Sequence, residues 1–296
     1  MRKHFPDESA DHVTDAPYPS SRWLVLDALR VHYVGADHET MPLYLGHHFY
    51  GAGANFLPLI SHLDITTLAL DRPGFGLTSR PHRNRHTKSL YTRRGAAELA
   101  WQVLESQYGD MPVMLAGASA GGTHVLEMAA LHPERVAGLV LIDAAITGDV
   151  GPPGWSRPLL RAPGVSHVGV QLVERRAHTV TKERIGRSWA NPSRVTDTII
   201  APYQQATAMP DYAHGLYHSF VGDAPPDLRS VLQRLDMPAL VVSGAKDRVI
   251  SPRSAARIAS LLKHGTFVEI ADAGHTPHEE QPERLAALIS EFHASL

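Results

Sequence analysis

A serine in a glycine-rich turn is the first residue of this chain whose surroundings point to chemistry. The segment 117–122, of sequence GASAGG, follows the apolar run 111–116 and precedes residues 123–131, which show helical periodicity. A strand that enters a helix through Gly-x-Ser-x-Gly must bend sharply, and the glycines leave room where a Cβ would clash. The bend exposes the hydroxyl of Ser119. Near pH 7 a serine nucleophile needs a histidine base, an acid that orients this base, and N–H donors for the oxyanion.

Two loops later in the chain supply the base and the acid. Asp247 follows the apolar run 239–243, and His275 lies in the loop after the apolar run 266–270. Each residue follows the carboxyl end of its predicted strand, the edge at which open α/β sheets bind ligands. The chain order Ser119, Asp247, His275 is that of the α/β-hydrolases, and it differs from the orders in chymotrypsin and subtilisin.

Asp143 is the alternative acid, because it follows the apolar run 136–142 and some α/β-hydrolases carry the acid on the corresponding strand. It also fits a helix or turn cap, which is the interpretation we favour. Asp247 alone would fit a turn-former, and His275 alone would fit a surface histidine. The agreement of the three positions favours the catalytic interpretation.

Short apolar runs that alternate with helical segments predict the elements that carry these loops. Two runs at 23–26 and 29–34 predict an antiparallel hairpin that turns at Asp27-Ala28. Further strands are expected at 42–46, 65–70, 113–116, 136–142, 239–243 and 266–270, and helices at 55–62, 90–108, 123–131, 254–263 and 283–293. The pattern predicts an α/β fold with a mostly parallel sheet of about eight strands and helices on both faces.

The alternation stops between residues 147 and 235. This stretch is rich in Pro, Arg and His and has helix-compatible pieces at 168–178, 182–190, 193–208 and 211–220. Because structureless loops longer than about 15 residues are rare, we expect an inserted helical cap over the carboxyl edge of the sheet. The domains predicted are a flexible tail at 1–21, a core at 22–146 and 236–296, and the cap at 147–235.

These motifs resemble those of the α/β-hydrolase fold superfamily from Arg22 to the C-terminus. The segment 71–76, of sequence DRPGFG, resembles that family's loop after the fourth strand, and 244–247 its acid loop. Gly274-His275 with Glu280 and Pro282 resembles its histidine loop, in which the last two residues are expected to shape the start of the final helix. The resemblance implies a Ser119-His275-Asp247 triad. It also implies an oxyanion hole formed by the backbone N–H groups of Ala120 and Phe49.

The oxyanion loop departs from the family pattern. Relatives commonly have His-Gly followed by an apolar residue, whereas this chain has His47, His48 and Phe49. The side chain of His48 either enters the substrate pocket or points to solvent, and we favour solvent. His278 is expected to be a loop residue that could line the pocket. No cluster of Asp, Glu or Cys at ligand spacing accompanies it, so no metal and no cofactor are predicted.

The residue types also limit the chemistry. Epoxide hydrolases and haloalkane dehalogenases of this superfamily use an aspartate nucleophile, and Ser119 argues against both. Serine favours acyl transfer, so the sequence predicts a hydrolase of an ester, thioester or lactone. C–C bond hydrolysis is less favoured, since Thr276 stands where such relatives often have tryptophan. A lyase, a cyclase, a perhydrolase and a non-catalytic ligand receptor remain alternatives.

Composition excludes several other classes. The 296 residues contain 28 Lys and Arg, 30 Asp and Glu and no Cys, with a formal net charge of -2. Disulfides and thiolate sites are therefore excluded, and no nucleic-acid or membrane partner is expected. Residues 1–20 lack the apolar core of a signal peptide. We expect a cytoplasmic protein with a small-molecule substrate; aromatic residues of the cap stretch either line an apolar substrate pocket or pack the cap onto the core (Trp155, Trp189, Tyr203, Tyr212, Tyr217 and Phe220).

Overall fold

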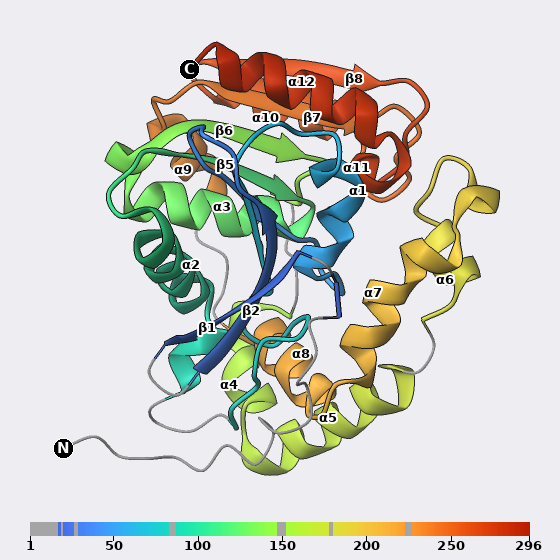
Figure 1. The fold of residues 1–296 in the computed structure, drawn as a ribbon. Coiled ribbons are helices and arrows are strands. Elements are labelled where there is room, and N and C mark those ends of the chain that lie inside the picture. The colour runs from blue at the N-terminus through green and yellow to red at the C-terminus, as the bar shows by residue number, and fades with distance from the viewer. Residues whose placement is uncertain are drawn as a thin grey trace.

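An eight-stranded sheet forms the centre of the computed structural model (Figure 1). The structure describes residues 17–18, 20–26, 29–82, 87–146, 152–177, 180–222 and 227–296. The strands are β1 (Ser21–Leu26), β2 (Leu29–Ala36), β3 (Leu43–Gly46), β4 (Thr67–Leu70), β5 (Val113–Ala118), β6 (Val136–Ile142), β7 (Ala239–Gly244) and β8 (Gly265–Ile270). Their order across the sheet is β1-β2-β4-β3-β5-β6-β7-β8.

Strand directions confirm the predicted mostly parallel α/β sheet. β1 pairs antiparallel with β2, and β2 antiparallel with β4, while all pairs from β4 to β8 are parallel. The observed strands lie within a few residues of the predicted ones. The predicted turn at Asp27-Ala28 lies outside the described residues.

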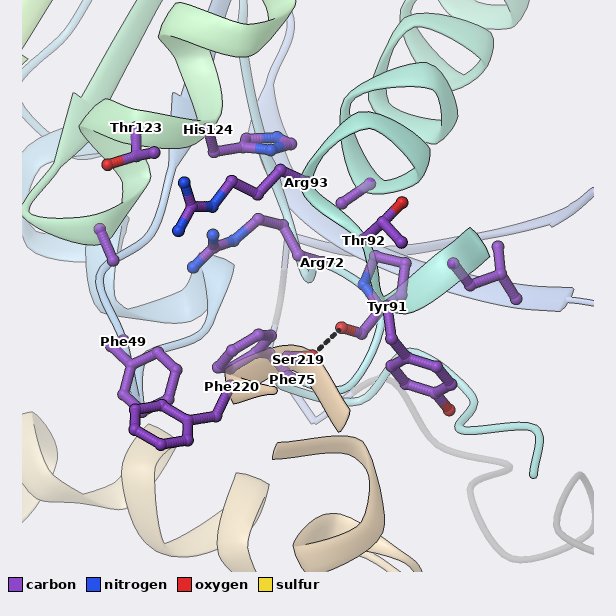
Figure 2. Close-up of a pocket in the computed structure, with 14 residues that line it drawn as sticks. Phe49, Arg72, Phe75, Tyr91, Thr92, Arg93, Thr123, His124, Ser219 and Phe220 are labelled. Carbon is purple, nitrogen blue, oxygen red and sulfur yellow. Dashed lines mark hydrogen bonds between the residues drawn. The ribbon is translucent and has the colours of Figure 1, made fainter. Parts of the chain in front are cut away.

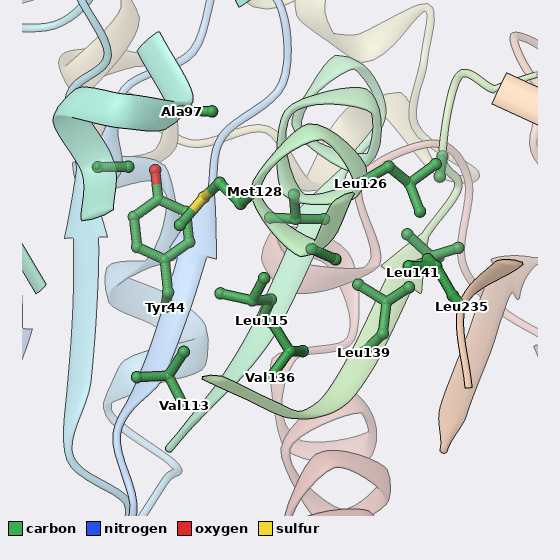
Figure 3. Close-up of a cluster of buried hydrophobic side chains, with 14 of the residues drawn as sticks. Tyr44, Ala97, Val113, Leu115, Leu126, Met128, Val136, Leu139, Leu141 and Leu235 are labelled. Carbon is green, nitrogen blue, oxygen red and sulfur yellow. The ribbon is translucent and has the colours of Figure 1, made fainter. Parts of the chain in front are cut away.

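Alternating side chains of the strands fill two hydrophobic cores, one on each face of the sheet. In β5, Val113 and Leu115 point into one core, whereas Met114 and Ala116 point into the other. All four are fully buried, so the strand is apolar nearly throughout, as expected for a strand covered on both faces. Figure 3 shows the first core between the sheet and α3 (Ala120–Leu131).

Helices cover both faces of the sheet. Those that contribute to the core of Leu115 are α2 (Arg93–Tyr108), α3, α9 (Leu228–Arg234) and α10 (Pro252–Leu261). The opposite core is covered by η2 (Gly53–Phe56), α1 (Leu57–Ile60) and α12 (Pro282–Ala294), and α11 (Pro277–Glu280) precedes α12. Short 3-10 helices occur at η3 (Lys88–Tyr91) and η4 (Pro133–Arg135).

A group of helices between β6 and β7 lies together beyond one end of the sheet (Figure 1). We call α4 (Arg157–Leu160), α5 (Pro163–Ala177), α6 (Lys182–Gly186), α7 (Asp197–Ala208) and α8 (Tyr212–Phe220) the cap helices; η5 (Gly154–Ser156) and η6 (Pro192–Arg194) lie in the same stretch. Tyr212 and Leu216 of α8 pack on Phe75 of the core. Helix α9 falls within the range predicted for the cap, but it packs against α3 and α10 of the core.

The start of the described chain contacts both the sheet and the cap helices. Ser21 falls within the predicted flexible tail, but this residue begins β1, and its Oγ lies 2.9 Å from Nε2 of His32. The hydroxyl of Tyr18 donates a hydrogen bond to Gln205 of α7. Residues 1–16 lie outside the described part of the chain. In the described part, no helix combines the length and apolarity needed to cross a bilayer.

Replacing Leu115 with alanine is expected to lower the free energy of unfolding by about 2–5 kcal/mol, because the fully buried side chain would leave a cavity. Urea denaturation followed by circular dichroism measures this change. The control is Met111→Ala just before β5, which is 46% exposed and should change stability by less than about 0.5 kcal/mol. Equal effects of the two substitutions would contradict the placement of Leu115 in the core.

Candidate active site

The turn between β5 and α3 holds Ser119 in a conformation that non-glycine residues rarely adopt. Its backbone angles are φ 50° and ψ -117°, and its N–H donates a hydrogen bond to the carbonyl of Ile142 at 2.9 Å. A Cβ on Gly117 would lie 2.4 Å from the carbonyl oxygen of Gly121. A Cβ on Gly121 would lie 1.9 Å from the carbonyl oxygen of Gly46. Both glycines are therefore needed for the bend that presents the serine hydroxyl.

The structure brings Ser119, His275 and Asp247 together in one line of hydrogen bonds. Nε2 of His275 lies 3.0 Å from Oγ of Ser119, and Nδ1 of His275 lies 2.8 Å from Oδ2 of Asp247. The other carboxylate oxygen of Asp247 accepts hydrogen bonds from the N–H groups of Val249 at 2.6 Å and Ile250 at 3.0 Å. The imidazole thus has a hydroxyl on one nitrogen and a fixed carboxylate on the other, as a general base requires.

Asp143, the alternative acid, lies beside Asp247 in the same buried region. The ligating atoms of Asp143, Asp247 and His275 all lie within 4.8 Å of one another. Burial, and then the negative charge of Asp247, raise the pKa of Asp143 well above its ordinary value. Burial also acts to raise the pKa of Asp247, but the hydrogen bond and charge of His275 outweigh it, and the net pKa is lowered. Asp247 is therefore the acid that contacts His275 and favours the ionised form.

Hydrogen bonds within the protein account for the position of Asp143. Its Oδ1 accepts from the hydroxyl of Ser243 at 2.7 Å and from the N–H of Gly244 at 3.2 Å. By distance alone, Asp143, Asp247 and His275 could also surround a metal ion. Because each of them already has a protein partner, no metal is needed to explain their arrangement.

Glu280 fixes the backbone of the histidine loop. Its Oε2 accepts from the N–H of Gly274 at 2.9 Å and from the N–H of Ala190 at 2.7 Å, and its Oε1 accepts from the N–H of Thr276 at 3.1 Å. The N–H groups on both sides of His275 are thus held by one carboxylate. Glu280 belongs to the predicted histidine loop, but no sequence pattern indicates its contact with Ala190, which lies in the stretch predicted as the cap.

Arg72 supports the loop that contains His47, His48 and Phe49. Its Nη2 donates to the carbonyl of His47 at 2.8 Å, and its backbone N–H donates to Nε2 of His47 at 3.2 Å. Nδ1 of His47 lies 2.8 Å from the carbonyl of His48. Across the site, Ala120 is the first residue of α3, so its N–H has no partner within the helix. Ala120 and Phe49, the two residues expected to form the oxyanion hole, line the same cavity.

Asp71, the residue before Arg72, connects further parts of the chain through its carboxylate. One carboxylate oxygen accepts from the N–H of Gly53 at 2.6 Å, and the other accepts from the N–H of Leu77 at 2.6 Å and lies 2.8 Å from Nδ1 of His32. Burial alone would raise the pKa of Asp71, but His32 and these N–H groups lower it overall. The sequence motif at 71–76 marked this loop but not the partners of Asp71.

The structure corrects the expectation for His48. We favoured a side chain that points to solvent, but His48 is only 7% exposed, and its Nε2 lies 2.8 Å from the hydroxyl of Tyr203 in α7. The Tyr203 hydroxyl also lies 3.0 Å from Oε1 of Glu279, which accepts a hydrogen bond from Nδ2 of Asn55 at 2.8 Å. The sequence does not predict this buried cluster, because no motif links residues so far apart. Its members are His48, Tyr203, Glu279 and Asn55.

His278 packs against the same cluster. It is fully buried, with its ring centroid 5.5 Å from that of His48, and neither of its ring nitrogens has a hydrogen-bond partner among the described residues. Burial lowers the pKa of His278 to about 3 and that of His48 well below its ordinary value. Both rings are therefore neutral at pH 7. Neither lines the two cavities described next, although both were candidate pocket residues.

Two cavities meet at Phe49 and Phe220. One, of about 100 Å³, is lined by Arg72, Arg93 and Ala120 among others. Figure 2 shows the guanidinium groups of Arg72 and Arg93 side by side, both pointing to the left of the view, where Thr123 and Phe49 also lie. The other cavity, of about 320 Å³, has a largely apolar lining and lies between Phe49-Tyr50 and the cap helices; Leu172, Val173, Tyr203, Tyr212 and Leu216 contribute to it.

Comparison with known proteins gives consistent matches. A family model described as alpha/beta hydrolase fold matches residues 42–282. The pimeloyl-acyl-carrier-protein methyl ester esterase of Neisseria meningitidis serogroup A is 28% identical over 277 residues, which cover 86% of this chain and 79% of the relative. The 2-hydroxymuconate semialdehyde hydrolase of Pseudomonas putida is 26% identical over 235 residues, which cover 76% and 75% of the two chains. A solved structure of a thermophilic esterase from Thermogutta terrifontis shares the fold, with a TM-score of 0.72, 21% identity, and coverage of 90% of this chain and 94% of that one.

The buried carboxyl of Glu279 predicts a pH-dependent stability. Burial raises its pKa from 4.5 to about 8, reinforced by the charge of Glu280 and opposed by hydrogen bonds from Asn55, Tyr203 and Thr276. Between these two values the folded protein keeps a proton that the unfolded chain has released. The contribution of Glu279 to the free energy of unfolding should therefore fall as pH rises through this window, by at most about 1.4 kcal/mol per pH unit, and level off above it. The buried His48 and His278 act in the opposite sense below their ordinary pKa, because their pKa values are lowered in the folded protein.

Urea denaturation between pH 5 and pH 9 measures this slope. Glu279→Gln cannot titrate, so the variant should lose that part of the slope. Glu283→Gln is the control, because the side chain of Glu283 is 83% exposed and should not contribute. A Glu279→Gln variant with the slope of the wild type would contradict the burial of a raised-pKa carboxyl at this position.

Proposed function

Because the chain belongs to the α/β-hydrolase fold family, we propose that it is a serine hydrolase that cleaves an ester, thioester or lactone bond of a small substrate. The observation that carries the proposal is the line of hydrogen bonds from Ser119 Oγ to His275 Nε2 at 3.0 Å and from His275 Nδ1 to Asp247 at 2.8 Å. Relatives named as esterases support the same chemistry. The apolar cavity under the cap helices supports a substrate with an apolar part.

Acylation follows from the positions of the three side chains. Nε2 of His275 takes the proton of Ser119 as Oγ attacks the substrate carbonyl. Asp247 accepts the hydrogen bond of the Nδ1 proton, which fixes the imidazole tautomer and stabilises the imidazolium that forms. The imidazolium then protonates the leaving group as the C–O or C–S bond breaks.

The negative charge on the oxygen of the tetrahedral intermediate requires hydrogen-bond donors that point at this oxygen. The N–H of Ala120 at the start of α3 and the N–H of Phe49 are the donors in this proposal, and each would lower the barrier by about 3 kcal/mol. In the second half of the reaction His275 takes a proton from water as the water oxygen attacks the acyl carbonyl. The acyl–Oγ bond then breaks, the acid is released, and the imidazolium returns its proton to Ser119. The cap helices exclude bulk water from these steps.

C–C bond hydrolysis is the second candidate, since one relative is named 2-hydroxymuconate semialdehyde hydrolase. The same serine, histidine and aspartate would act on a ketone carbonyl. Turnover of a diketone substrate without turnover of any ester would favour this candidate over the first.

Hydrolysis of p-nitrophenyl esters of increasing acyl length tests the proposal. Ser119→Ala should lower kcat by at least about a thousand-fold for every ester that the wild type cleaves, because the nucleophile is lost. Ser260→Ala on the exposed side of α10 is the matched control and should retain full activity. Residual turnover in Ser119→Ala close to that of the wild type would exclude Ser119 as the nucleophile.

The two neighbouring acids give a second prediction. Asp247→Asn should lower kcat by about 10³–10⁴-fold, because an amide cannot fix the imidazole tautomer or stabilise the imidazolium. Asp143→Asn should retain kcat within about ten-fold, since its amide oxygen still accepts hydrogen bonds from Ser243 and Gly244. Steady-state kinetics on the same ester compares the variants. A larger loss in Asp143→Asn than in Asp247→Asn would assign the acid to Asp143.

A further inference from the structure

The buried cluster around Tyr203 connects the two loops that flank Ser119. His48 precedes Phe49 in the oxyanion loop, and Glu279 lies four residues after His275. Tyr203 belongs to α7, a cap helix, and its hydroxyl contacts both side chains, at 2.8 Å from His48 Nε2 and at 3.0 and 3.1 Å from the two oxygens of Glu279. A single cap hydroxyl therefore bridges the oxyanion loop and the histidine loop.

Each member of this bridge is held from a second side. Nδ2 of Asn55 donates to Glu279 at 2.8 Å, while Oδ1 of Asn55 accepts from the N–H of Ala52 at 2.8 Å. His48 packs so closely under the next turn that a Cβ on Gly51 would lie 2.7 Å from its ring. Tyr203 is 2% and Glu279 5% exposed. Because the groups are buried, their hydrogen bonds do not compete with water and hold a defined geometry.

The position of His48 next to Phe49 links this bridge to the proposed oxyanion hole. His48 lies directly before Phe49, the residue whose N–H is the second oxyanion donor in the proposed function. The turn from His48 to Gly51 is closed by a hydrogen bond from the N–H of Gly51 to the carbonyl of His48 at 3.2 Å, and Phe49 lies inside it. The peptide between His48 and Phe49 is thus held at its carbonyl by Gly51 and by Nδ1 of His47 at 2.8 Å, and the side chain of His48 gives the same segment a further anchor at Tyr203.

We propose that Tyr203 is a positioning residue that acts through His48, so that the cap helix α7 holds the oxyanion loop in its productive conformation. Glu279 orients the Tyr203 hydroxyl, and Asn55 orients Glu279. The phenolic group has one proton, so it donates to one of its two partners and accepts a hydrogen bond from the other. The inference rests on the proposed serine hydrolase function, because the oxyanion hole stabilises the negative charge that forms when Ser119 attacks a carbonyl.

The test measures kcat and KM for the best p-nitrophenyl ester in Tyr203→Phe, which keeps the ring and removes only the hydroxyl. We expect kcat to fall by roughly 10- to 100-fold, less than the loss from removing an oxyanion donor outright, with KM within about three-fold because the interaction acts in the transition state. A trifluoromethyl ketone, which forms a tetrahedral adduct with serine, should lose affinity by a similar factor. Tyr33→Phe is the control, since it removes a tyrosine hydrogen bond to Gln107 at 2.8 Å remote from the site, and it should leave kcat unchanged.

A double-mutant cycle separates this role from a general loss of structure. In a His48→Gly background the loop no longer has the side chain that Tyr203 anchors, so Tyr203→Phe should have no further effect on kcat. Glu279→Gln keeps an acceptor and a donor in place and should retain kcat within about three-fold. Thermal unfolding of each variant shows whether the proteins compared are folded. If Tyr203→Phe does not fold, Glu279→Leu replaces it in the cycle.

The outcomes distinguish the two proposals. No turnover of any ester by the folded wild type would overturn the proposed function. Two results would overturn the positioning role of Tyr203 alone. One is wild-type turnover with unchanged kcat in Tyr203→Phe. The other is a loss of kcat on Tyr203→Phe that is equal with His48 present and in the His48→Gly background. A fall in kcat on Tyr203→Phe that appears only when His48 is present supports the positioning role.

Discussion

The strained backbone of Ser119 is the constraint on which the rest of the site depends. With φ 50° and ψ -117°, the residue can sit between β5 and α3 only because Gly117 and Gly121 allow the strand and the helix to approach one another. The parallel strands around it then determine what it meets. β7 and β8 end at the same edge of the sheet as β5, and the loops that follow them bring Asp247 and His275 to Ser119.

Much of the fold could be predicted from the sequence, because buried parallel strands have a distinctive pattern. Runs such as 136–142 are apolar throughout and are bounded by polar segments, so their positions needed no tertiary information. The order of the three chemical residues could be predicted for the same reason, since each follows the end of a predicted strand. The helix α9 was not predicted, and its residues were assigned to the cap, because a helix next to the cap helices has the same pattern whether it packs on the cap or on the core.

The surroundings of the three residues could not be predicted. The hydrogen bond between His48 and Tyr203 joins residues 155 positions apart, and no periodicity relates a loop histidine to a tyrosine of a cap helix. Loops usually run over the protein surface, which is why solvent was the expected direction for His48. The sequence indicated a turn cap or a competing acid at Asp143, whereas the structure places its carboxyl beside that of Asp247 and gives the two opposite pKa shifts.

The most direct test of the account is to treat the folded protein with a fluorophosphonate and to locate the adduct by mass spectrometry. The account predicts one adduct per chain, on Ser119, formed far more slowly in a His275→Gln variant because the serine then has no base. An adduct on another residue, or no adduct on a folded protein at high reagent concentration, would contradict the assignment of Ser119 as an activated nucleophile.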